Sequence, residues 1–67
     1  MDLKKRFAQN LIEQREKKGL TPGQLAEAAS VDLDHLESIE GGHEEPLLEP
    51  LVKLAASLGV TTDELLR

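Results

Sequence analysis

Apolar side chains recur along this 67-residue chain at spacings of three and four residues, the period of an amphipathic helix. One stripe predicts a helix over about residues 3–18 and consists of Leu3, Phe7, Leu11 and Arg15. A second stripe predicts a helix over about residues 48–58 and consists of Leu48, Leu51, Leu54, Ala55 and Leu58. A glycine follows each segment, as is typical of helix ends.

Capping residues predict two short helices between these stripes. Thr21 is a good N-cap, since a proline at the first helical position and the capping-box residue Gln24 follow it. This helix continues to Ala29, and Asp32 caps the next, which runs to Glu40 before two glycines. A second capping box, residues 61–64, starts a final short helix. The chain is therefore predicted to be all-α: one domain, residues 1–67, folded as a compact five-helix bundle.

Composition narrows the class of protein. There are no cysteines, so disulfides and thiolate metal sites are impossible, and this usage fits a reducing cytoplasm. No stretch is long and apolar enough to span a membrane. The carboxylates accompany no nucleophile and base, and two histidines match no common metal-ligand spacing. We therefore expect no enzyme activity, no metal and no cofactor.

Charge is distributed unevenly along the sequence. Residues 1–20 carry six basic and three acidic side chains, whereas residues 21–50 carry eight carboxylates and neither lysine nor arginine. The eight are Glu27, Asp32, Asp34, Glu37, Glu40, Glu44, Glu45 and Glu49. A surface that binds DNA must offset phosphate charge, so this acidic segment disfavours tight non-specific binding.

Several separated blocks of residues nevertheless resemble the Cro/phage-repressor family of helix-turn-helix regulators. The blocks are Arg15–Leu20, Leu25-Ala26, Ile39–Gly42 with Pro46, and Leu54-Ala55 with Leu58–Val60. The resemblance covers nearly the whole chain, and several blocks agree in spacing. The resemblance implies that a helix-turn-helix spans about residues 21–40, and that the third helix lies in the major groove of DNA.

The resemblance also implies an ion pair between Arg15 and Glu40. The residue pattern agrees, because Arg15 falls on an apolar stripe and a charge there needs a partner. The alternative is that Arg15 extends along the apolar surface to solvent.

Family positions that contact DNA fall here on polar, acidic and apolar residues. They are Gln24, Leu33, Asp34, His35, Glu37, Ser38 and the loop residue His43. His35 and Ser38 can donate to base edges, whereas Asp34 and Glu37 can accept only from cytosine amino groups. Relatives usually have a basic loop after the paired glycines, where this chain has His43 followed by two glutamates.

Two functions therefore remain open. The first is a transcriptional regulator that binds double-stranded DNA as a homodimer, with the third helix as the reader. The second is a protein-interaction module that keeps the fold but has lost DNA binding through its acidic face. Leu33 and Leu47 fit poorly in the core and are candidates for self-association or for a protein partner. A third possibility is that the chain is a fragment or an engineered variant that lacks an effector domain.

Overall fold

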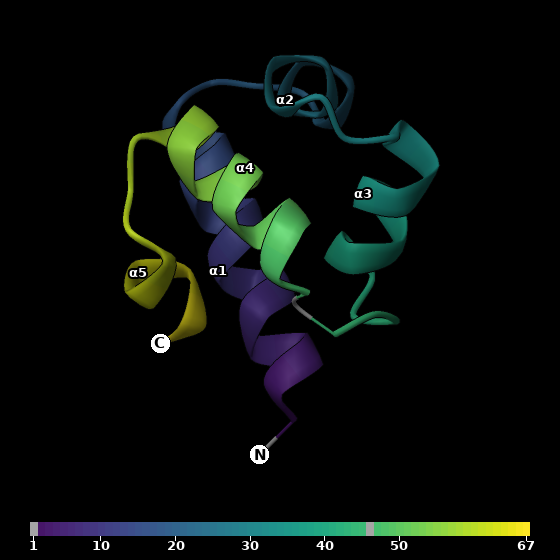
Figure 1. Cartoon of the computed structure of the whole chain (residues 1–67), viewed down its shortest axis with the longest axis vertical. Helices are drawn as coiled ribbons and strands as arrows, with labels where there is room; N and C mark the ends of the chain where they lie inside the picture. The colour runs from purple at the N-terminus through teal and green to yellow at the C-terminus, as the bar shows by residue number, and fades with distance from the viewer. Residues whose placement is uncertain (1, 46) are drawn as a thin grey trace.

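The computed structural model describes residues 2–45 and 47–67 and consists of five helices joined by short turns (Figure 1). Their order is α1 Leu3–Lys17, α2 Pro22–Ala29, α3 Leu33–Glu40, α4 Leu48–Leu58 and α5 Thr62–Leu66. Within the described ranges there is no strand. The predicted all-α class is confirmed. Pro46, one of the residues that carried the family resemblance, lies outside the described residues.

Side-chain caps hold the starts of four helices, three of them predicted from the sequence. In α2, Thr21 Oγ1 accepts from the Gln24 N–H at 3.1 Å, and Gln24 Oε1 accepts from the Thr21 N–H at 2.9 Å. A second reciprocal pair starts α5, and an aspartate cap starts each of α1 and α3. The exception is α4, whose N-cap residue Leu47 supplies no side-chain hydrogen bond.

The core lies where α1 and α4 meet the other three helices. The helix α1 packs against α3 and α5, while α2 packs against α3 and α4, and α4 also contacts α5. Each side chain buried at the centre stabilises the fold by about 1.5–3 kcal/mol relative to an exposed one. The largest fully buried side chains are Phe7, Leu11, Leu25, Leu36, Ile39, Leu54, Leu58 and Leu65.

Two leucines predicted on the apolar stripes lie outside this core. Leu3 is 50 % exposed and Leu48 is 76 % exposed. Each is the first residue of its helix. The first buried residues of these helices, Phe7 and Leu51, come about one turn later, so periodicity identified the correct face but extended it past the core.

The last helix is held by a polar contact as well as by Leu65. The Asn10 side-chain amide donates to the Leu65 carbonyl oxygen at 3.0 Å, which ties α5 to α1. This bond satisfies a carbonyl near the end of the chain that a five-residue helix leaves without an internal partner.

Among the helices of the described ranges, none is long and apolar enough to cross a membrane.

Candidate nucleic-acid interface

A tight turn sets the angle between α2 and α3. Ser30 caps α2 in the left-handed region, with φ 56° and ψ 43°. The next residue, Val31, donates its N–H to the Ala26 carbonyl at 2.9 Å. Backbone of this kind ends a helix within one residue and redirects the chain, although glycine is the usual occupant. The two helices are consequently packed against each other and joined by three residues.

Packing of α3 separates its buried side from its outward side. Leu36 and Ile39 are fully buried against the other helices. Since neighbouring residues of a helix differ by about 100° in direction, the residues between these two must point away from the core. The outward residues that we call the reading face are Leu33, Asp34, Glu37 and Ser38. Leu33, Asp34 and Glu37 are exposed and Ser38 is half-buried.

The charges of the reading face have no partner among the ion pairs of the described residues. Those pairs join Arg15 to Glu40, Lys17 to Glu13, His35 to Glu44 and Lys53 to Glu49. Asp34 and Glu37 are in none of them. Both carboxylates are therefore free to accept hydrogen bonds from a ligand, and both would repel a nearby phosphate.

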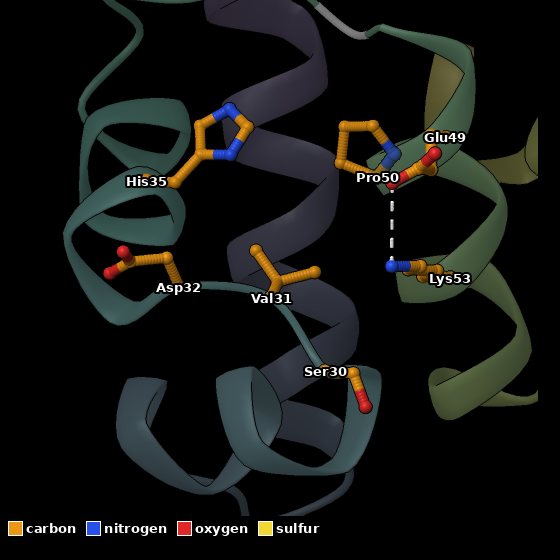
Figure 2. A pocket seen from close by; sticks show the side chains of 7 residues that line it. All are labelled: Ser30, Val31, Asp32, His35, Glu49, Pro50 and Lys53. Atoms are coloured by element: carbon orange, nitrogen blue, oxygen red, sulfur yellow. Dashed lines mark ion pairs between the residues drawn. The ribbon is translucent and has the colours of Figure 1, made fainter.

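His35 is directed away from the reading face. Its Nε2 lies 3.1 Å from Glu44 Oε1 in the loop after α3. A small cavity of about 130 Å³ lies between α3 and α4. Figure 2 shows the His35 ring on the α3 side of this cavity, facing Pro50 of α4. The family resemblance grouped His35 with Asp34 and Ser38, but the structure groups it with the loop and with α4. Spacing alone gave no signal of this pairing.

The two remaining predicted contact residues, Gln24 and His43, lie at either end of the α2–α3 segment. Gln24 uses its side-chain oxygen to cap its own helix, which leaves its NH₂ group as the donor that can reach a ligand. His43 is exposed, and its ring lies over Gly41, where an added Cβ would come within 2.8 Å of His43 Cδ2. A side chain at 41 would therefore displace the His43 ring, whereas glycine is favoured at 42 by its φ of 77°.

Arg15 and Glu40 fix the end of α3 to α1. Arg15 Nε donates to Glu40 Oε2 at 2.9 Å, and Nη2 donates to Oε1 at 3.3 Å. A third bond, from Arg15 Nη1 to the Leu20 carbonyl at 2.8 Å, holds the turn that leads into α2. The side chains are only 12 % and 10 % exposed. The pair thus joins both helices of the motif to α1, and it plays a scaffold role.

Comparison with known proteins decides the family. The helix-turn-helix family model matches residues 11–65, which includes α2, α3 and α4. The chain belongs to this helix-turn-helix family.

Within the described residues no group of three or more histidine, aspartate or glutamate side chains is placed to hold a metal ion.

Curated relatives of this helix-turn-helix chain are transcriptional regulators. The regulator DdrOP3 of Deinococcus deserti is 34 % identical over 61 residues, which are 91 % of this chain and 47 % of that protein. The uncharacterized regulator y4dJ of Sinorhizobium fredii is 34 % identical over 65 residues, 97 % of this chain and 84 % of its own length. The chain thus spans about half the length of the first relative and most of the second.

Solved structures share the arrangement of the five helices. The restriction-modification controller protein C.AhdI of Aeromonas hydrophila has a TM-score of 0.88 and 32 % identity, covering 92 % of this chain and 94 % of that one. The hypothetical transcription factor NHTF from Neisseria has a TM-score of 0.93 and 30 % identity, covering 98 % and 76 %.

These relatives favour one of the two functions left open by the sequence. Family and relatives together support a DNA-binding transcriptional regulator and do not favour the protein-interaction module. A family of transcription regulators also points away from enzymatic activity. The acidic reading face is thus a feature that an account of DNA binding must explain.

Proposed function

We propose that this helix-turn-helix protein regulates transcription by placing α3 in the major groove of double-stranded DNA. The observation that supports this most directly is the reading face itself. Leu33, Asp34 and Glu37 are exposed on the helix that the motif presents, and among residues 2–45 and 47–67 the two carboxylates are in no ion pair. These side chains do not pack in the core, so they can contact the edges of DNA bases.

Acidic residues on a reading helix imply a particular chemistry of recognition. Asp34 and Glu37 accept hydrogen bonds only, and the major-groove donor that carboxylates pair with is the cytosine N4 amino group. Ser38 can donate or accept, and Leu33 can contact a thymine methyl group. Base contacts of this kind carry sequence preference, while the missing cations keep non-specific affinity low.

Phosphate contacts on this side must come from groups other than lysine or arginine of residues 21–50. Backbone N–H groups at the start of α4 are one source, because Leu47 leaves them without a side-chain cap. The Gln24 NH₂ group at the start of α2 is another. Both lie at helix N-termini, where the helix dipole favours an anion.

We further propose that the working form is a homodimer. Leu47, Leu48 and Val52 are exposed apolar residues at the start of α4, and Leu48 and Val52 lie four apart on one helical face. Two copies would place two reading helices on two half-sites, as other helix-turn-helix dimers do. Sedimentation of the wild type and of Leu48→Asp tests this: only the wild type is expected to self-associate, and a monomeric wild type rejects the dimer.

Titration against random-sequence duplex DNA at low salt, followed by fluorescence anisotropy, tests the DNA-binding proposal. We expect weak binding that strengthens as salt is lowered, because even a few phosphate contacts release counterions. The absence of binding at protein concentrations of tens of micromolar would overturn the proposal. If the protein does bind, repeated selection from a duplex library would report whether bases with an amino group are preferred at the α3 contacts.

A further inference from the structure

The segment that carries the reading face has no lysine or arginine, so positive charge for DNA phosphate must come from another element. No lysine or arginine occurs between Lys18 and Lys53. Of the cations outside this interval, Lys17 is paired with Glu13 at 3.6 Å and Lys53 with Glu49 at 3.5 Å. A cation that binds DNA phosphate beside the end of α3 would therefore have to come from another helix that packs close to that end.

Lys5, in the first half of α1, meets this requirement. It packs over the glycine turn that ends α3: a Cβ added to Gly42 would lie 3.5 Å from Lys5 Cγ and 3.8 Å from Lys5 Cα. Both distances are ordinary van der Waals contacts, so Lys5 lies directly beside residue 42. Lys5 is exposed, and it is in none of the ion pairs of the described residues.

A groove of about 250 Å³ lies beside this contact. It is lined by Lys5, Ala8, Gln9, Glu40, Gly41 and Gly42. The carboxylate of Glu40 receives two hydrogen bonds from Arg15, so its charge is compensated within the chain. The groove thus offers an ammonium group and the exposed carboxamide of Gln9, both hydrogen-bond donors, on a wall that is otherwise small and neutral.

We propose that Lys5, together with Gln9, binds a phosphodiester group of the DNA backbone at the end of α3. This inference rests on the proposed function and names the backbone contact that the acidic segment lacks. A phosphate held there would position α3 in the groove and would carry no base information itself. The cation is supplied by α1 across the glycine turn, in place of a basic loop after α3.

The test compares two lysine variants that change net charge equally. Lys5→Gln removes the proposed contact, and Lys18→Gln removes an exposed lysine whose Nζ lies near Gly59, at the far end of α4. Both take the formal net charge from −5 to −6. The logarithmic slope of affinity against salt, measured on the random duplex, should fall by about 0.9 per chain for Lys5→Gln and stay unchanged for Lys18→Gln. Thermal melting of both variants establishes that they are folded.

Each outcome is decisive. Equal slopes for the two variants, with wild-type binding intact, would overturn the role of Lys5 and leave the proposed function standing. A wild type that binds no duplex would overturn both. A slope that falls for Lys5→Gln alone, and falls less for Gln9→Ala, would support an ammonium contact assisted by the amide. Inorganic phosphate, added at constant ionic strength, should not displace the duplex. This result would show that the site binds the DNA backbone and not free phosphate.

Discussion

Arg15 on α1 and Glu40 at the end of α3 are joined by two hydrogen bonds, of 2.9 and 3.3 Å, in a region where both side chains are about nine-tenths covered. Such a planar, two-point contact is specific to arginine and carboxylate. It locks the end of α3 to α1, and Gly42, which Lys5 contacts, follows two residues later in the chain. The pair therefore determines where the reading face stands relative to the first helix.

Removal of one member of this pair should destabilise the fold. Glu40→Ala leaves the Arg15 charge largely buried and unpaired, and we expect the free energy of unfolding to fall by about 3 kcal/mol. Urea denaturation measures this change. The matched control is Glu13→Ala, which breaks an exposed pair with Lys17 and should cost less than about 0.5 kcal/mol. Similar losses in the two variants would contradict the scaffold role of Glu40.

The turn between α2 and α3 carries strain at Ser30 that glycine would relieve. A non-glycine residue in the left-handed region costs roughly 1–2 kcal/mol, against roughly 0.5–1 kcal/mol for the extra freedom of an unfolded glycine. Ser30→Gly should therefore raise the melting temperature slightly. Gly59→Ala, at φ 70° and with only Lys18 Nζ near the new Cβ, at 4.0 Å, should lower it. If both variants shifted stability in the same direction, left-handed strain would not be the cause.

His35 stands among acidic groups, so a positive charge at this position should favour DNA. The charged groups around it are Glu44 from the loop, Asp32 at the start of α3, and Glu49 and Lys53 from α4. A permanently charged side chain here would reduce the negative charge beside the reading face. His35→Lys should therefore raise duplex affinity at constant salt, measured by fluorescence anisotropy.

The control for this effect is His35→Gln, which adds no positive charge and should leave duplex affinity close to that of the wild type. Equal affinities for His35→Lys and His35→Gln would show that position 35 does not lie near the DNA backbone.

Local rules were sufficient to predict the helices. Caps such as Thr21 and Asp32 act on backbone groups within three residues, and apolar spacing fixes one face of each helix, so both are readable without tertiary information. The predicted end of α1 was one residue too long, since Lys18 is its C-cap. The exposed Leu48 was wrongly assigned to the core because periodicity does not report where neighbouring helices end.

The site was less predictable, because its contacts join residues that are distant in the sequence or in the local pattern. The direction of His35 depends on where the loop places Glu44, and the position of Lys5 depends on how α1 crosses the glycine turn. The Asn10–Leu65 bond spans 55 residues and has no sequence signature. By contrast, the contact of Arg15 with Glu40 was expected, since a charge on an apolar stripe requires a partner.

The most direct test of the central claim asks whether the reading face of α3 meets DNA. The measurement is the salt dependence of random-duplex affinity for Asp34→Lys with Glu37→Lys, beside a control with Glu16→Lys and Asp63→Lys, which are exposed positions on α1 and α5. Both double variants take the formal net charge from −5 to −1. We predict that affinity rises and the slope steepens by up to about 1.8 for the α3 variant alone. Identical slopes in the two variants would contradict the placement of α3 on DNA.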